Sequence, residues 1–346
     1  MKARSRWARW LPCALLAAGA SLFACSGGSS GGASPGDGGG GDTGSGSHDA
    51  GAGDSSTGQG HDGGASGPDA GTDATSSGGD AGDAGIVDAG PDTALPGWTL
   101  TWSDEFDGPD GSAVDPTKWK HDVGGSGWGN QELEYYTDGT QNAVVQGGTL
   151  VITATTEGAS QYSCWYGGCT YTSARLLTQG LFSQAYGRFE ARVQMPTGKG
   201  LWPAVWMLGD DIGDAGWPAC GEIDFMETIG TDIGENHGSL HAPNYNPTAT
   251  YPLPDGGSFA DGFHVFAIEW EPGTVRFYVD DTLYETQTKA AVPSGGTWEF
   301  DSEPFFLLAN VAVGGQWPGS PDGTTTFPQT MKVDWVRVYQ KDGTEP

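Results

Sequence analysis

The chain has 346 residues, of which 60 are Gly, and its formal net charge is −29. A sequence pI near 4.1 excludes a basic footprint for nucleic acid and argues against polyanionic ligands and against electrostatic adsorption to anionic lipid. The 36% of hydrophobic residues are too few for a compact fold throughout, whereas 11% of aromatic residues are too many for disorder throughout. The composition therefore predicts segments of different kinds.

Residues 1–25 have the pattern of an export signal. Four basic residues precede an apolar stretch, Trp10–Ala24, that is too short to cross a bilayer. The stretch ends in Leu22-Phe23-Ala24-Cys25-Ser26, which resembles the bacterial lipobox, in which the cysteine is acylated and becomes the new N-terminus. We therefore expect lipidation at Cys25 and a lipid anchor at the bacterial cell envelope or surface. The alternative is ordinary cleavage near Ala24, which would give a secreted protein.

Residues 26–96 are predicted to be a disordered linker. This segment contains 24 Gly, 11 Ser and 11 Asp, with no Lys or Arg and almost no large apolar side chain. Such a chain behaves as a flexible coil with a root-mean-square reach of about 45 Å. An acidic calcium-binding tract is disfavoured, because the Asp residues follow no fixed repeat.

Residues 97–346 have the composition of one folded domain. They carry 11 Lys and Arg against 33 Asp and Glu, a formal net charge of −22. An acidic surface of this kind favours neutral or cationic ligands. The length suits a single all-β sandwich.

Alternation of apolar and polar residues predicts β-strands along this domain. In Gly187–Pro196 the apolar residues occupy every second position, which indicates a half-buried strand. No segment has a long helical period, and no repeat of propeller-blade length is present. The pattern predicts an all-β jelly-roll sandwich of two antiparallel sheets. Further strands are expected at 149–156, 264–270, 274–280, 304–313 and 331–340.

Three acids lie in one apolar run, Glu222-Ile223-Asp224-Phe225-Met226-Glu227. In a regular strand Glu222 and Asp224 would point to one face and Glu227 to the other. One extra residue at Phe225 or Met226 would form a β-bulge and return Glu227 to the shared face. We therefore expect the three carboxylates to lie together.

Paired carboxyls separated by about 5 to 5.5 Å perform retaining glycoside hydrolysis. Asp224 would bind Glu222, and its negative charge would keep Glu227 protonated. The alternative, three solvated acids on an exposed strand, is disfavoured by the apolar residues between them. Hydrolysis of this type needs no metal, and no His-Glu-x-x-His pattern is present. We expect no cofactor for catalysis.

The run Glu222–Glu227 resembles the signature of glycoside hydrolase family 16, in the longer bulged form of its laminarinase-like (endo-β-1,3-glucanase) branch. The resemblance extends over residues 98–340. It implies a jelly-roll sandwich with a concave substrate cleft, Glu222 as nucleophile, Glu227 as acid/base and Asp224 as their assistant. The other similar stretches are 102–106, 128–136, 201–207, 312–319 and 334–339.

The resemblance also implies substrate and metal contacts. Flat pyranose faces need aromatic platforms and a few polar groups. Core packing is the alternative for any single Trp. A structural calcium would use hard oxygen ligands, whereas the alternative for Asp334 is a plain surface position. The implied residues are Trp202 and Trp206 around the reacting sugar, Asn130, Arg175, His241 and Gln316 at hydroxyls, Glu132, Trp128 and Trp317 as weaker contacts, and Glu105, the Gly148 carbonyl and Asp334 as calcium ligands.

Three cysteines remain in the folded domain. Cys164 and Cys169 are close enough in sequence to close a small loop, which export would permit. Cys220 is expected to be a buried apolar filler, and a thiol partner for it stays open.

The sequence therefore favours an extracellular endo-β-1,3-glucanase that acts on β-glucan as a monomer and meets the membrane only through its lipid. A mixed-linkage β-1,3-1,4-glucanase and a non-catalytic β-glucan-binding module of the same fold are the alternatives. The acidic domain disfavours sulfated polysaccharides.

Overall fold

The computed structural model describes residues 95–343. The predicted signal, Cys25 and the linker as far as residue 94 lie outside the described residues. No helix among residues 95–343 is long and apolar enough to span a bilayer. The elements are β1 (Trp98–Asp104), β2 (Lys120–Asp122), β3 (Glu134–Tyr136), β4 (Ala143–Gln146), β5 (Thr149–Ala154), η1 (Ala159–Gln161), β6 (Ser163–Cys164), β7 (Gly167–Gly168), β8 (Tyr171–Ser173), β9 (Arg175–Leu177), β10 (Gly187–Gln194), β11 (Leu201–Gly209), α1 (Ile212–Ala215), β12 (Glu222–Glu227), β13 (Glu235–His241), β14 (Thr248–Pro252), β15 (His264–Glu271), β16 (Thr274–Val279), β17 (Thr282–Thr288), η2 (Lys289–Ala291), β18 (Phe305–Val313) and β19 (Gln329–Lys341).

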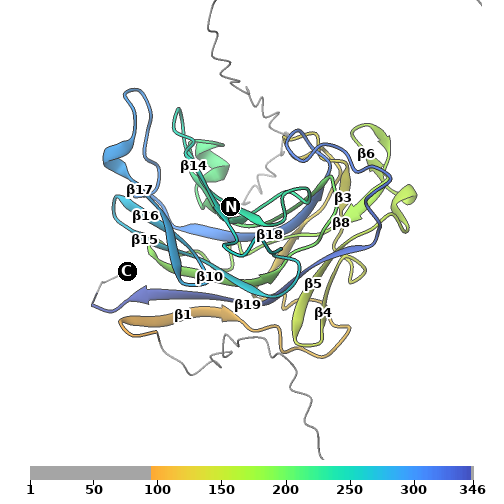
Figure 1. Cartoon of the computed structure of the whole chain (residues 1–346), viewed down its shortest axis with the longest axis horizontal. Coiled ribbons are helices and arrows are strands. Elements are labelled where there is room, and N and C mark those ends of the chain that lie inside the picture. The colour runs from red at the N-terminus through yellow and green to blue at the C-terminus, as the bar shows by residue number, and fades with distance from the viewer. Residues whose placement is uncertain (1–94, 344–346) are drawn as a thin grey trace, which may run out of the picture. The chain divides into compact units, whose positions relative to one another are not determined.

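Two large antiparallel sheets dominate the described part of the chain, as predicted, and two small two-stranded sheets, β3-β8 and β6-β7, accompany them. The eight-stranded sheet has the order β17-β16-β15-β10-β19-β5-β4, with β1 paired to β19, and the seven-stranded sheet has the order β14-β13-β12-β11-β18-β9-β2. Figure 1 shows them as curved layers, with β19 in one and β18 in the other. Long antiparallel strands that return across two sheets are the jelly-roll arrangement. The predicted fold class is confirmed.

The core lies between the two sheets. On β10, Phe189, Ala191 and Val193 are fully buried against it. The outer face of β10 differs from the prediction of a half-buried strand, because Arg188 and Glu190 are buried as well. These two side chains form an ion pair with each other, and Arg188 also binds Glu269. Because their charges are paired, Arg188 and Glu190 can be buried on the outer face without leaving an isolated charge away from water.

Strands β11 and β12 position the chemistry. Val205 and Met207 of β11 face the core, while Trp202 and Trp206 alternate with them and remain partly exposed. We call this opposite side of the seven-stranded sheet the site face. It contains the side chains described below.

The described cysteines behave as expected. Cys164 and Cys169 form a disulfide that closes the hairpin of β6 and β7. Cys220 is a free, buried thiol, and burial raises its pKa to about 12.

Candidate active site

A bulge in β12 brings the three acids to one side, as predicted. Ala204 pairs with Glu227 and Val205 with Met226, but Trp206 pairs with Asp224, so Phe225 is the extra residue. Phe225 and Met226 are both fully buried in the core. Two consecutive residues on the core side restore Glu227 to the site face.

The side chain of Asn236 on β13 holds this bulge. Its amide nitrogen donates to the carbonyl of Phe225 at 3.1 Å, and its amide oxygen accepts from the backbone N–H of Glu227 at 3.1 Å. Asn236 is fully buried. It therefore replaces the backbone pairing that the bulge interrupts, so that neither backbone group is left without a partner.

Each outer acid accepts a hydrogen bond from an indole. Trp217 Nε1 donates to Glu222 at 2.8 Å, and Trp202 Nε1 donates to Glu227 at 2.9 Å. Between the two acids, Asp224 Oδ2 lies 3.1 Å from His241 Nε2. The indoles and the imidazole fix the orientation of the carboxyl groups.

The acids have perturbed affinities for protons. Burial, followed by the charge of Asp224, raises the pKa of Glu222 to about 7. The same two causes raise the pKa of Glu227 well above its usual value. A carboxyl that stays protonated near neutral pH can serve as a general acid.

His241 belongs to this cluster as a cation. Burial alone would lower its pKa, but the hydrogen bond to Asp224 and the neighbouring carboxylates raise it to about 10. Glu222, Asp224 and His241 are close enough to hold an ion, and no other such group occurs among residues 95–343. A protonated imidazole has no free lone pair for a metal. In its protonated form, His241 makes an ion pair with Asp224 at 3.1 Å and lies 3.8 Å from Glu222.

The aromatic platforms lie beside the acids. Trp206 donates its indole N–H to Asn310 at 2.8 Å, and the guanidinium of Arg175 lies over its ring. Arg175 also contacts the ring of Trp128 and forms an ion pair with Asp122. The predicted contacts Trp202, Trp206 and Arg175 are thus gathered on the site face.

Two loops, residues 130–132 and 315–317, lie against each other beside Trp202. We call them the second wall of the site. Asn130 donates its side-chain amide to Glu132, and the backbone N–H of Gln316 donates to the Asn130 carbonyl. The side chain of Gln316 is exposed, whereas Glu132 is buried and its carboxylate also binds Tyr136. Glu132 therefore supports the wall. Trp317, which is exposed, packs edge-on against Trp202.

The predicted calcium ligands have other partners. Glu105 accepts two hydrogen bonds from Arg337, and Asp334 forms an ion pair with Arg192 at 2.6 Å. In this arrangement each of the two carboxylates faces a guanidinium. Gly148 has a positive φ in the turn before β5. The calcium site stays a prediction.

Comparisons with known proteins identify the family of this chain. Residues 127–337 match the model for glycosyl hydrolases family 16. The chain belongs to this family. It is 46% identical to a beta-glucanase of Rhodothermus marinus, over 71% of this chain and 86% of that protein. As a glycoside hydrolase of family 16, the chain is an enzyme.

Two solved structures are similar in sequence and in shape. The catalytic domain of an endo-1,3-beta-glucanase (laminarinase) from Thermotoga petrophila is 47% identical, with a TM-score of 0.66, over 71% of this chain and 99% of that one. The endo-beta-1,3-glucanase from Pyrococcus furiosus is 46% identical, with a TM-score of 0.66, over 70% and 94%. The resemblance in the sequence is therefore correct at the level of the family.

Three residues of the site were not predicted. Trp217 reaches Glu222, Asn236 holds the bulge, and Asn310 fixes Trp206. Asn310 had a visible signal, since it is a polar residue within the otherwise apolar run Phe305–Val313. Trp217 and Asn236 could not be found from a periodic sequence pattern, because their partners lie on other elements of the site.

Proposed function

We propose that this enzyme cleaves internal linkages of β-1,3-glucan of the laminarin type, with retention of configuration. The observation that carries the proposal is the bulge at Phe225, which places Glu222, Asp224 and Glu227 on the site face beside Trp202 and Trp206. The relatives named for action on β-1,3-glucan support the substrate class.

The reaction proceeds in two displacements. The Glu222 carboxylate attacks the anomeric carbon while Glu227 gives its proton to the leaving glycosidic oxygen. A glycosyl-enzyme ester forms, and the aglycone departs as an alcohol. Glu227, now ionised, then takes a proton from water as the water attacks the anomeric carbon and releases Glu222.

The surroundings suit these roles. The pKa of Glu227 is raised well above its usual value, as a proton donor requires. Burial and Asp224 also raise the pKa of Glu222, to about 7, which opposes the ionised form that a nucleophile needs. The positive charge of His241 lowers the pKa of Glu222 from what burial and Asp224 would give. Asp224 pairs with His241, and its negative charge raises the pKa of Glu227.

The remaining parts of the proposal concern location. Acylation of Cys25 would tether the enzyme at the bacterial envelope, and residues 26–96 would let it reach polymer away from the surface. The enzyme would act as a monomer on β-glucan, without a cofactor for catalysis. A structural calcium at Glu105, Gly148 and Asp334 would be separate from this chemistry.

The test measures reducing ends released from laminarin, barley mixed-linkage glucan and agarose. We expect laminarin to be the best substrate, shortened by internal cleavage, and the first product to keep the β-configuration by NMR. Glu222→Gln should abolish turnover, and Glu227→Gln should slow it by about 10²- to 10⁴-fold. Glu235→Gln, which changes an exposed acid on β13, should leave it unchanged.

The outcomes separate the alternatives. Faster release from barley glucan would identify a mixed-linkage enzyme. Binding of laminarin without any turnover would identify a glucan-binding module. Full activity of Glu222→Gln and Glu227→Gln would refute the assigned mechanism.

A further inference from the structure

A disulfide-closed hairpin presents an exposed tryptophan. The hairpin joins β6 to β7 through Cys164 and Cys169, and Trp165 and Tyr166 lie between its cysteines. Trp165 is 50% exposed, which places it among the most exposed large hydrophobic residues of the described chain. An indole left half in water forgoes a large hydrophobic gain, so its position calls for a reason.

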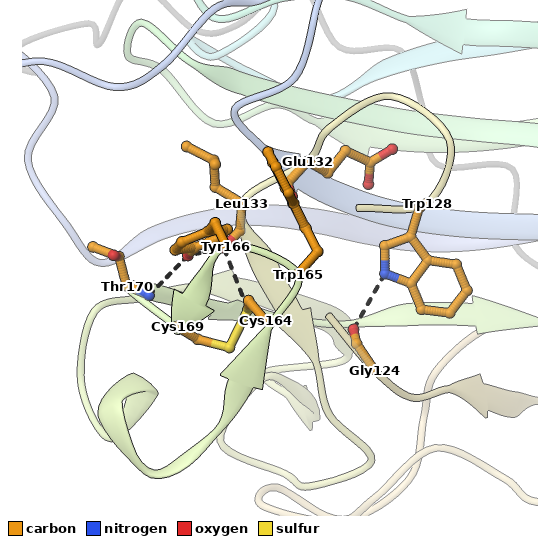
Figure 2. Close-up of a disulfide and its surroundings, with 9 residues drawn as sticks. All are labelled: Gly124, Trp128, Glu132, Leu133, Cys164, Trp165, Tyr166, Cys169 and Thr170. Atoms are coloured by element: carbon orange, nitrogen blue, oxygen red, sulfur yellow. Dashed lines mark hydrogen bonds between the residues drawn. A yellow bond between two sulfur atoms is a disulfide. The ribbon is translucent and has the colours of Figure 1, made fainter. Parts of the chain in front are cut away.

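The hairpin holds Trp165 rigidly. The Trp165 indole N–H donates to the carbonyl of Glu132 at 2.7 Å, and its backbone N–H donates to the carbonyl of Gly125 at 2.8 Å. The hydroxyl of Tyr166 donates to the carbonyl of Leu133 at 2.6 Å. Figure 2 shows the hairpin against the segment that carries these partners.

A glycine allows the indole to approach this closely. A side chain at Gly127 would bring its Cβ within 2.9 Å of the Trp165 ring, and the backbone there has a φ of +83°. The edge of the ring that carries Nε1 therefore packs against backbone, while half of the residue stays exposed. Little side-chain entropy remains to be lost when a ligand covers the exposed side.

The segment beneath Trp165 is also the second wall of the active site. The Glu132 side chain binds Asn130, whose carbonyl accepts from Gln316. A Cβ on Gly315 would lie 3.6 Å from the Trp202 ring and 3.7 Å from Cγ of Glu132. Trp202 in turn donates to Glu227. A continuous set of neighbours therefore connects Trp165, through Glu132 and Gly315, to Trp202 and its hydrogen bond with Glu227.

We propose that Trp165 is a stacking platform for a glucose residue of the glucan chain that lies beyond the reacting sugar. This inference rests on the proposed function, since it assigns an additional contact to the same polymer. The exposed indole offers a flat apolar face that matches a pyranose ring. The ligand is neutral, which agrees with a domain charge of −22. The platform serves chains that are long enough to extend from the acids to Trp165.

The experiment uses the full chain with Glu222→Gln, so that binding is measured without cleavage. The dissociation constants for laminarin and for a β-1,3-linked glucose disaccharide are compared by calorimetry. Trp165→Ala should weaken laminarin binding about fivefold and leave disaccharide binding unchanged. Trp165→Phe keeps an aromatic face but loses the bond to Glu132, and it should retain most of the affinity. Leu283→Ala, an exposed apolar residue on β17, is the matched control and should bind as the parent does.

Kinetics in the active enzyme provide the second readout. Trp165→Ala should raise KM for laminarin about fivefold with kcat unchanged, since the platform lies outside the reacting subsite. Equal laminarin affinity for Trp165→Ala and the parent would overturn the inference. A loss as large in Trp165→Phe would also overturn it, because the anchoring bond and not the ring face would then be responsible. If the enzyme binds laminarin but does not cleave it, the proposed function fails while the platform remains testable by binding.

Discussion

The side chain of Asn236 offers the sharpest test of how the fold maintains the site. Asn236→Ala removes both hydrogen bonds that hold the bulge, together with the contact to Tyr284. The carbonyl of Phe225 and the N–H of Glu227 would then be buried without partners, at a cost of about 1 to 3 kcal/mol each. We expect a destabilisation of about 2 to 6 kcal/mol, which lowers Tm by on the order of 10 °C in a domain of this size.

Activity should fall further than stability alone explains. If the bulge relaxes, Glu227 turns away from Glu222, and a displacement of about 1 Å at a catalytic group costs on the order of 10²-fold in kcat. The assay measures kcat on laminarin at a temperature where the variant remains folded by circular dichroism.

A matched control exists in the same chain. Asn142 is also fully buried, and its amide donates to the carbonyl of Thr153 and accepts from Thr137. Asn142→Ala should lower Tm by a similar amount and leave kcat of the folded enzyme unchanged. Wild-type kcat in folded Asn236→Ala would refute the reasoning, as would an equal fall of kcat in both variants.

Three further results are expected. The charge of His241 lowers the pKa of both Glu222 and Glu227, so His241→Ala should move both limbs of the pH profile of kcat/KM to higher pH; unmoved limbs would contradict the ion-pair cluster. The folded-state pKa of Glu222 is raised from 4.5 to about 7, so the stability that this group contributes is complete below pH 4.5 and is lost as pH rises through 7. Glu222→Gln should therefore have the same free energy of unfolding as the parent near pH 4.5 and a higher one at pH 8, by up to about 3 kcal/mol. A difference between the two proteins that does not change with pH would refute this. Labelling with palmitate should follow Cys25 and disappear in Cys25→Ala, and an unlabelled parent would remove the anchor.

Several strands were predictable because apolar and polar residues alternate along them. Strands such as Thr274–Val279 alternate between the core and the outside, and their bounds agree with the sequence pattern within a residue or two. The bulge was also predictable, since three acids and three apolar residues in Glu222–Glu227 satisfy both faces only with one extra residue. Both inferences need only the order of residues along one strand.

The residues that orient the acids were harder to predict from the sequence. Trp217 lies five residues before Glu222, beyond the start of its strand, and Asn236 lies on the neighbouring β13. Contacts of this kind depend on where loops and registers place a side chain, and no local period encodes them. The same reason explains the buried outer face of β10, where Glu190 owes its burial to Arg188 and to neighbouring strands.

The position of the acids follows from the core more than from the acids themselves. Like charges at Glu222, Asp224 and Glu227 repel, so their own interactions do not draw them together. Phe225 and Met226, by contrast, each gain about 1.5 to 3 kcal/mol from burial, and both reach the core only if the strand is bulged. A regular strand would turn Met226 to the site face and Glu227 into the core, where an ionised carboxyl is costly. Phe225 and Met226 in the core, together with the buried amide of Asn236, therefore hold the three acids on the site face.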